Sequence, residues 1–453
     1  MMWSLRAAIA QAGGRLVGAD REFASVGTDS RVDCRGQLFV ALRGAHFDGH
    51  DHVAAAQDAG AVAVMVDHPL ALDIPQWIVE DTRLGLGRLA SAWRDRFPGR
   101  VIGITGSNGK TTVKEMVAGI LEHAGRVRAT QGNFNNDIGM PLTLLRARNE
   151  DFLVLEMGAN HHGEIGYLTD IARPDVALIT NAGRAHLEGF GSVDGVAHAK
   201  GEIARGLKSE GVFIFPGDAP YVGLWQRLAA GRPTFTFALS DRADLRADPA
   251  GISVDWTEEG FRTHVVAHQG GEEIALTLRL AGEHNVRNAL AATAVARALG
   301  VMPDAIRAGL AARPPVKGRL NPLRCGAVRV IDDSYNANPD SLAAAIAVLA
   351  GLTGRRWLVL GDLGELGANA EELHCEIGRT ARSAGIERLV SVGSLSAAAS
   401  HAFGSGGRHF ETQDALRQAL TSELTADDCV LVKGSRAARM DQIVDALCAG
   451  EVS

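Results

Sequence analysis

The ten residues Gly103-Ile104-Thr105-Gly106-Ser107-Asn108-Gly109-Lys110-Thr111-Thr112 determine the class of fold that this sequence encodes. They continue an apolar run at residues 101–105 that is typical of a buried strand, and they lead into a stretch at 110–121 with one apolar helical face. Between a strand and a helix, glycines let backbone N–H groups approach phosphate oxygens, and the helix N-terminus adds the positive end of its dipole. The segment therefore predicts a nucleotide site.

We expect every residue from Gly106 to Thr112 to contact ATP. Lys110 can reach the β- and γ-phosphates, and Thr111 can offer its hydroxyl to Mg²⁺. The order Gly-x-x-Gly-Lys-Thr-Thr is a short variant of the phosphate-binding loop, because Ile104 stands where the strict pattern has glycine. An ordinary glycine-rich turn is the alternative, but the Gly-Lys-Thr-Thr order at the start of a helix favours nucleotide binding.

Outward from this loop, apolar strands alternate with alanine-rich amphipathic stretches, the pattern of α/β layers. A length of 453 residues predicts about three domains, and a Phe-Pro-Gly break at 97–99 and an Arg-Pro-Pro break at 313–315 divide the chain accordingly. We predict a small α/β N-terminal domain at 1–98 and a central P-loop-type domain with a mostly parallel sheet at 99–313. A Rossmann-like, doubly wound domain is predicted at 314–453.

The composition excludes several classes of protein. Hydrophobic residues make up 46% and charged residues 22%, which are the values of a globular and not a disordered chain. The net charge of −7 without a basic block argues against nucleic acid as a partner. The longest apolar stretch, 342–352, is too short to insert into a membrane, which takes about 20 residues. No signal peptide is apparent, and five scattered cysteines without a Cys-x-x-Cys pair predict neither a disulfide framework nor a zinc site, which suits the cytoplasm.

Two further polar residues follow predicted strands. Glu156 comes directly after the strand at 152–155, and His186 lies in the loop after the strand at 176–179. The carboxyl ends of parallel strands share one sheet edge, so both side chains are expected near Lys110. We predict that Glu156 binds the Mg²⁺ of a nucleotide, and that His186 binds a second ion or contacts the transferred phosphoryl group.

Lys200 lies on the apolar stripe of a predicted helix at 196–207, in line with Val196, Ile203 and Leu207. Burial lowers the pKa of a lysine and makes a neutral amine available, and such an amine can react with CO₂ to give a carbamate able to organise Mg²⁺. A lysine that reaches out to solvent from the edge of the stripe is the alternative, and the spacing alone favours it.

Taken together, the ordered motifs of the chain resemble those of the Mur ligase family over essentially all 453 residues. The motifs that carry the resemblance lie at 29–31 (Asp-Ser-Arg), 44–50, 106–112, 133–141, 156–160, 181–186, 200, 283–288, 318–319, 333–339 (Asp-Ser-Tyr-Asn-Ala-Asn-Pro), 361–367 and 433–436. Each motif is weakly specific by itself, but their joint order is highly specific.

The resemblance implies an ATP-dependent amide ligase that joins D-alanyl-D-alanine to UDP-N-acetylmuramoyl-tripeptide through an acyl phosphate, in the cytoplasmic part of peptidoglycan synthesis. The first domain would bind the UDP-sugar substrate, the middle domain ATP, and the third domain the incoming amine. The resemblance implies that Thr111 and Glu156 bind one Mg²⁺ and that His186 and carbamylated Lys200 bind a second. It implies that Asn288, Arg319 and Asp333 contact the nucleotide, and that Ser30, Arg31, Asn136 and Asn336 contact the substrate. The catalytic residues that it implies are Lys110, His186 and Lys200. A monomer is expected.

Other functions remain open at this point. A related ligase would add the third residue of the stem peptide, but those that add diaminopimelate resemble one another in an Asp-Asn-Pro-Arg segment that this chain lacks. A folylpolyglutamate-type ligase shares the ATP domain without a domain like residues 1–98. Outside the ligases, a P-loop kinase would release a phosphorylated product, and a nucleotide-dependent switch would hydrolyse ATP without a carboxylate substrate.

Overall fold

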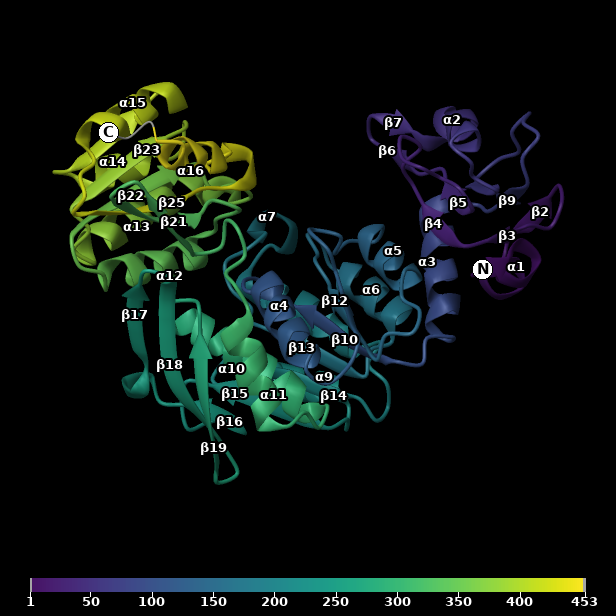
Figure 1. The fold of residues 1–453 in the computed structure, drawn as a ribbon, viewed down its shortest axis with the longest axis horizontal. Coiled ribbons are helices and arrows are strands. Elements are labelled where there is room, and N and C mark those ends of the chain that lie inside the picture. The colour runs from purple at the N-terminus through teal and green to yellow at the C-terminus, as the bar shows by residue number, and fades with distance from the viewer. Residues whose placement is uncertain (1, 451–453) are drawn as a thin grey trace.

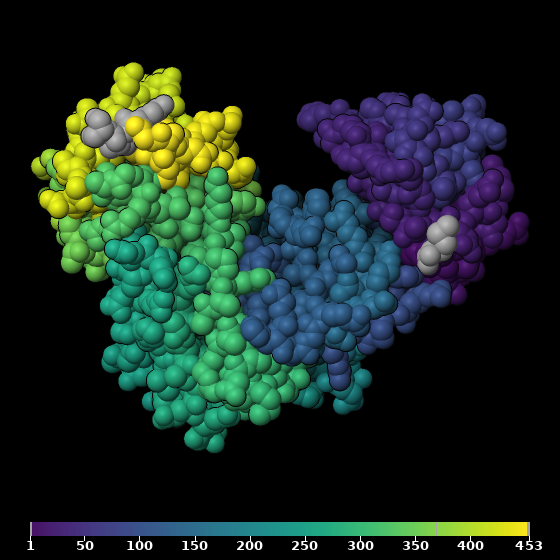
Figure 2. Space-filling model, viewed as in Figure 1, coloured from purple at the N-terminus to yellow at the C-terminus, as the bar shows by residue number. Residues whose placement is uncertain are grey.

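The computed structural model describes residues 2–450, in three α/β domains that follow one another along the chain. The N-terminal and C-terminal domains both pack on the central domain and stand apart from each other (Figure 1). The space-filling view shows an open gap between them on this face of the molecule (Figure 2). The α/β fold class predicted from the sequence is confirmed.

The N-terminal domain contains a five-stranded sheet in the order β2-β9-β8-β5-β4, in which only β2 runs antiparallel to its neighbour. The strands are β2 (Arg15–Val17), β4 (Ser25–Gly27), β5 (Gln37–Val40), β8 (Ala63–Val66) and β9 (Gln76–Ile78). Helix α2 (Val53–Asp58) covers one face, and α1 (Leu5–Ala12) and α3 (Thr82–Arg94) cover the other. Short strands β1 (Trp3–Ser4), β3 (Glu22–Phe23), β6 (Arg43–Gly44) and β7 (Phe47–Asp48) pair outside this sheet.

Helix α3 also joins the N-terminal domain to the central one. Trp93 donates through Nε1 to the Ala147 carbonyl (3.0 Å), and the buried Arg94 donates through Nε to the Ala172 carbonyl (2.8 Å). The Arg94 guanidinium also donates to Asp175 Oδ2 (3.2 Å), so its charge is paired within the interface. The apolar side of α3 belongs to one continuous core that runs through both domains.

The central domain is built on a ten-stranded sheet in the order β11-β12-β10-β13-β14-β15-β16-β18-β17, with β19 paired to β18. The parallel part comprises β11 (Val127–Ala129), β12 (Phe152–Glu156), β10 (Arg100–Thr105), β13 (Val176–Ile179), β14 (Val212–Pro216), β15 (Thr234–Ala238) and β16 (Leu245–Ala247). An antiparallel extension follows, formed by β17 (Ser253–Thr257), β18 (Gly260–Gln269) and β19 (Glu272–Leu278).

Helices cover both faces of the central sheet. One face packs against α4 (Lys110–Leu121), α10 (Glu283–Ala298) and α11 (Pro303–Ala312). The other packs against α5 (Gly139–Leu145), α6 (Glu164–Ala172), α8 (Val193–Gly201) and α9 (Val222–Ala229). Because β10 is an inner strand of a parallel sheet, the loop that follows it lies at the carboxyl edge, where α/β proteins bind ligands.

The C-terminal domain has a six-stranded sheet in the order β20-β21-β25-β22-β23-β24, parallel except for β20. Its strands are β20 (Asn321–Cys325), β21 (Val328–Asp333), β22 (Arg355–Gly361), β23 (Arg388–Val392), β24 (Gly407–Phe410) and β25 (Asp428–Lys433). Helices α12 (Pro339–Ala350), α13 (Ala370–Ser383) and α14 (Ala397–Phe403) cover one face, and α15 (Gln413–Glu423) and α16 (Asp441–Cys448) the other. Helices on both faces make the domain doubly wound, as predicted.

Two expectations at the level of single elements are wrong. A disulfide joins Cys325, at the end of β20, to Cys448, at the end of α16, although no disulfide was expected. The two cysteines are 123 residues apart, and only the fold brings these two ends together. The helix expected at 196–207 ends at Gly201 and continues as a single 3₁₀ turn at Glu202–Ala204. In the part of the chain that the structure describes, no helix is long and apolar enough to cross a membrane.

Candidate active site

The turn between β10 and α4 brings its backbone unusually close to neighbouring residues. Gly106 and Gly109 have φ angles of 147° and 79°, which favour glycine. A Cβ atom at Gly106 would lie 1.9 Å from Thr180 Oγ1, and one at Gly109 would lie 2.4 Å from Asn288 Oδ1. No other residue fits either position, so the backbone N–H groups at the start of α4 stay accessible to an anion.

Lys110 is the first residue of α4, and its side chain bends back along the loop. Its Nζ donates to the Gly106 carbonyl (2.6 Å) and to the Ser107 carbonyl (3.2 Å). Burial lowers the pKa of Lys110; the charge of Glu156 opposes this effect and that of Arg319 adds to it. A cation held at this point faces the cleft described below, as the phosphate-binding assignment requires.

Glu156 ends β12, beside Ile104 of β10, and its carboxylate is buried. Its Oε2 accepts from Thr111 Oγ1 (2.9 Å) and its Oε1 accepts from Asn135 Nδ2 (2.8 Å). A hydroxyl and a carboxylate in contact offer the oxygen ligands that Mg²⁺ prefers, and the Asn135 amide holds the carboxylate through its nitrogen. The structure therefore places Thr111 and Glu156 together, and these residues fit one Mg²⁺.

His186 lies in the loop after β13, on a left-handed residue with φ 53°. Its Nδ1 is 2.5 Å from Oε2 of Glu365, which belongs to the C-terminal domain and also has a positive φ of 59°. Burial lowers the pKa of His186; Glu365 opposes this effect, and Lys110 and Lys200 add to it. With Nδ1 beside a carboxylate, Nε2 is the nitrogen available to a ligand.

Lys200, on α8, is 1% exposed, so the predicted inward position is correct and the alternative of a lysine that reaches solvent is wrong. Its Nζ lies 4.9 Å from the centre of the Phe190 ring and donates to the Ala159 carbonyl (3.4 Å). Burial, with the charge of Lys110 adding to it, lowers the pKa of Lys200 to about 7. Ala159 and His186 line the cleft, whereas Lys200 is not among the lining residues and contacts the Ala159 carbonyl from the buried side.

A cleft of about 630 Å³ extends from the phosphate-binding loop to the C-terminal domain. Asn288, Arg319 and Asp333, predicted to bind the nucleotide, all line it. The Arg319 guanidinium lies 4.5 Å from the centre of the Tyr335 ring. Asp333 Oδ2 pairs with Lys433 Nζ at 2.5 Å. Burial raises the pKa of Asp333, against the opposing charge of Lys433.

The predicted substrate residues fall into two places. Asn136 and Asn336 line the cleft, on the central and C-terminal domains respectively. Ser30 and Arg31 lie on the N-terminal domain and are not among the residues that line the cleft. The exposed Arg31 guanidinium instead pairs with Asp29 (2.8 Å), which lowers the pKa of Asp29 to about 2.

Several residues in or beside the cleft carried no predicted role. Asn135 supports the Glu156 carboxylate, and Lys433 pairs with Asp333. Arg184 and Glu365 contact partners across the domain boundary. Each of these residues lies in one of the motifs quoted above. For Lys433, its position at the end of an apolar strand could have indicated a place at the carboxyl edge of the sheet. No pattern in the sequence indicates which side chains meet between domains.

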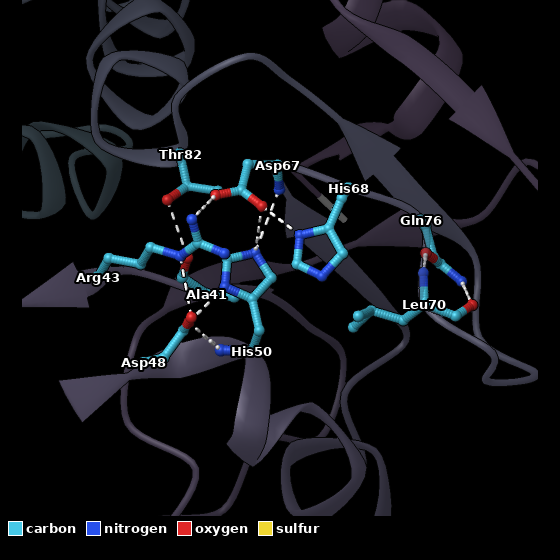
Figure 3. Close-up of polar contacts among 9 residues, drawn as sticks. All are labelled: Ala41, Arg43, Asp48, His50, Asp67, His68, Leu70, Gln76 and Thr82. Atoms are coloured by element: carbon cyan, nitrogen blue, oxygen red, sulfur yellow. Dashed lines mark hydrogen bonds and ion pairs between the residues drawn. The ribbon is translucent and has the colours of Figure 1, made fainter.

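The N-terminal domain holds a separate polar network around His50 (Figure 3). Among residues 2–450, His50, Asp67 and His68 have the ligand types and spacing of a metal site. His50 Nδ1 lies 2.5 Å from Asp48 Oδ1, and His50 Nε2 accepts from the Asp67 N–H group (3.1 Å). Because both ring nitrogens are engaged and Arg43 pairs with Asp67 (3.2 Å), we interpret the network as a support for the loop after β5.

Comparison with known proteins gives matches over nearly the whole chain. The matching family models are Mur ligase family, catalytic domain, over residues 22–93; Mur ligase middle domain, over 104–296; and Mur ligase, glutamate ligase domain, over 318–436. The chain is 44% identical over 438 residues to the UDP-N-acetylmuramoyl-tripeptide–D-alanyl-D-alanine ligase of Escherichia coli strain K12, an alignment that covers 96% of each chain.

Solved structures agree with these matches. A crystal structure of MurF from Acinetobacter baumannii superposes with a TM-score of 0.91 at 35% identity and 99% coverage of each chain. The MurF ligase from Thermotoga maritima, in complex with ADP, superposes with a TM-score of 0.84 at 28% identity, covering 94% of this chain and 97% of that one.

The phosphate-binding loop, the carboxylate beside it and the cleft shared by two domains define a nucleotide-dependent enzyme of the α/β class. The order of the three domains and the matches above are more specific. The chain belongs to the Mur ligase family.

The close approach at Gly109 gives a test of the nucleotide site. In Gly109→Ala, the new methyl group would collide with Asn288 and displace the start of α4, so we expect at least a tenfold loss of affinity for ATP. Calorimetric titration with a non-hydrolysable ATP analogue measures it. Gly271→Ala is the matched control, since Gly271 has φ 89° and nothing within 4 Å of an added Cβ. Equal affinities in both variants would contradict the assignment of this turn.

Proposed function

We propose that this protein is the ATP-dependent ligase that joins D-alanyl-D-alanine to UDP-N-acetylmuramoyl-tripeptide. The single observation that carries the proposal is the cleft, which brings the Lys110 loop of the central domain opposite Arg319, Asp333 and Asn336 of the C-terminal domain. The names of the similar proteins support the choice of substrates. We place the reaction in the cytoplasm, where ATP and UDP-linked sugars occur, and propose a monomer.

The chemistry explains why such an enzyme needs ATP. A carboxylate does not condense with an amine in water, because oxide is too poor a leaving group. When the carboxylate attacks the γ-phosphorus, ADP departs and an acyl phosphate forms. The amine nitrogen then attacks the acyl carbon, and phosphate leaves from the tetrahedral intermediate as the nitrogen loses a proton. The main tasks of the protein are to position the reactants and to stabilise charge.

The residues of the cleft suit these tasks. Lys110 and Arg319 would offset the charge of the triphosphate, and the domain boundary at 313–318 would let the third domain close and exclude water. Thr111 and Glu156 would hold one Mg²⁺, and His186 with Lys200 a second. When bound, such ions neutralise phosphate oxygens. In this assignment the N-terminal domain, with Ser30 and Arg31, binds the UDP end of the substrate.

We further propose that Lys200 carries a carbamate in the active enzyme. A pKa of about 7 makes a large fraction of this side chain a neutral amine at physiological pH, which is the form that reacts with CO₂. An ammonium group there repels Lys110 and would repel Mg²⁺, whereas a carbamate replaces that positive charge by a negative one. The carbamate would extend from behind Ala159 toward the cleft.

The substrate assignment predicts that phosphate release from ATP requires both UDP-N-acetylmuramoyl-tripeptide and D-alanyl-D-alanine. Turnover is measured with a panel of UDP-muramoyl peptides and amines. Activity with a diamino acid and a dipeptide acceptor, but not with D-alanyl-D-alanine, would replace this assignment by the ligase that adds the third stem residue. Turnover with folate and glutamate would indicate a folylpolyglutamate ligase, and turnover without any amine a kinase or a switch.

Lys110→Ala removes the cation of the phosphate-binding loop. Loss of one group that stabilises developing charge costs about 3–4 kcal/mol, so we expect kcat to fall by a factor on the order of 10²–10³. Single-turnover formation of the acyl phosphate should fall equally. Arg417→Ala, which removes a surface arginine that pairs with Asp414 within α15 (2.7 Å), is the control and should retain wild-type turnover. Near-normal turnover of Lys110→Ala would remove this lysine from the mechanism.

Lys200→Met should be folded and nearly inactive, and short carboxylic acids should partly restore activity by occupying the place of the carbamate. Carbon-13 NMR after incubation with labelled bicarbonate reports the carbamate directly, without turnover. Lys114 is a matched buried lysine, 2% exposed, whose Nζ donates to the Thr130 carbonyl (2.7 Å) and pairs with Glu115 (2.6 Å).

The carbamate signal should therefore persist in Lys114→Met and disappear in Lys200→Met. A plain amine at Lys200 in a nucleotide complex with both metals bound would refute the carbamate. Full activity of Lys200→Met in CO₂-depleted buffer would do the same.

A further inference from the structure

Arg184 lies in the loop between β13 and His186 and makes most of its polar contacts with the C-terminal domain. Its Nε donates to Asp340 Oδ1 and its backbone N–H group to Asp340 Oδ2, both at 2.7 Å. Its Nη1 donates to the two carboxylate oxygens of Glu376 at 2.9 and 3.0 Å. Asp340 lies in the first turn of α12 and Glu376 in α13, so one guanidinium connects two helices of another domain.

The directions of these contacts constrain the domain in more than one way. A guanidinium presents its donors in a fixed plane, so two carboxylates on different helices define both a distance and an orientation. Asp340 also receives the Arg184 backbone N–H group, which ties the main chain of the loop to α12. The raised pKa of Arg184 agrees with these two carboxylates at its donors, although burial alone would lower it.

Two neighbouring contacts cross the same domain boundary. Asn338, the N-cap of α12, donates through Nδ2 to Asn108 Oδ1 of the phosphate-binding loop (2.7 Å). Glu365 pairs with His186, two residues after Arg184. The C-terminal domain thus contacts the loop of His186 and the loop that binds phosphate at the same time, beside the cleft.

On the other side of the domain boundary the contacts are mainly apolar, and the Arg329 guanidinium lies 5.7 Å from the centre of the Trp256 ring. Phe261 of β18 packs into the core of the C-terminal domain with Leu320 and Ile331, close to where the chain passes from one domain to the next. The contacts at the connecting side anchor the C-terminal domain near its start. We infer that its orientation relative to the cleft is set by the polar contacts on the cleft side. There Arg184 makes four hydrogen bonds to α12 and α13, three through its guanidinium and one through its backbone N–H group.

We propose that Arg184 is a positioning residue that holds the C-terminal domain closed over the nucleotide and keeps the His186 loop in place. Arg184 does not touch the reacting atoms; it acts through Asp340 and Glu376. The inference rests on the proposed function for one step, that the C-terminal domain delivers the amine. The closed arrangement itself can be measured without turnover.

The experiment compares Arg184→Met, Glu376→Gln and the double variant with the wild-type protein. The side chains of Arg184 and Glu376 are 32% and 44% exposed, and solvent weakens an ion pair of this kind. We therefore expect a rise of only about tenfold in the KM for D-alanyl-D-alanine, with a smaller change in kcat. Small-angle scattering with a non-hydrolysable ATP analogue should show a less compact molecule. The effects of the two single changes should not add, because Arg184→Met already removes the contact that Glu376→Gln weakens. Arg184→Lys, which cannot reach both carboxylates at once, should recover only part of the loss.

Arg408→Met is the matched control, because Arg408 pairs with Glu423 inside the C-terminal domain (2.6 Å). This variant should leave the KM and the compactness of the molecule unchanged. Wild-type KM and compactness in Arg184→Met would overturn the inference, as would full additivity of Arg184→Met and Glu376→Gln. A wild-type protein with no ligase activity would refute the proposed function instead, while the scattering comparison would still test closure.

Discussion

The turn between β10 and α4 has no room for a side chain at Gly106 or Gly109, and the rest of the cleft is organised around that constraint. The space that a Cβ would need at these positions is occupied by Thr180 from the end of β13 and by Asn288 from α10. The close packing of a strand end, a loop and a helix on the turn is what keeps backbone N–H groups directed at one point. Glu156 and Lys110 are then set by their places on β12 and α4.

Some charged side chains in and beside the cleft form ion pairs within the protein, and others have no partner of opposite charge there among residues 2–450. Asp333 and Lys433 pair at the ends of adjacent parallel strands, where side chains of matched register meet. Lys110 and Lys200 have no carboxylate in hydrogen-bonding contact among the described residues, and burial lowers the pKa of both. A buried cation without a carboxylate favours an anion beside it, which at Lys110 is the triphosphate of the proposed mechanism, whereas at Lys200 the proposed carbamate replaces the cation itself.

Residues whose position depends on local pattern could be predicted from the sequence, and residues that meet across the fold could not. The apolar runs correctly indicated the strand that ends at Glu156 and the strand that precedes the loop of His186. The helical stripe included Lys200, but its spacing alone favoured a lysine that reaches solvent, and the structure buries the side chain. The same stripe overextended its helix, because periodicity does not show that α8 ends at Gly201. The pairs Arg184–Glu376 and Cys325–Cys448 are separated by 192 and 123 residues, and neither leaves a signal in a single sequence.

Helix α3 has a further consequence, for the order in which the chain folds. Its sequence belongs to the N-terminal domain, but Arg94 and Trp93 find their hydrogen-bond partners at Asp175, Ala172 and Ala147. During synthesis the N-terminal residues leave the ribosome first and domains tend to fold in that order. The first domain can therefore collapse early, but Arg94 stays without its partner until Asp175 emerges. Completion of the first domain is thereby coupled to the formation of the parallel sheet of the second.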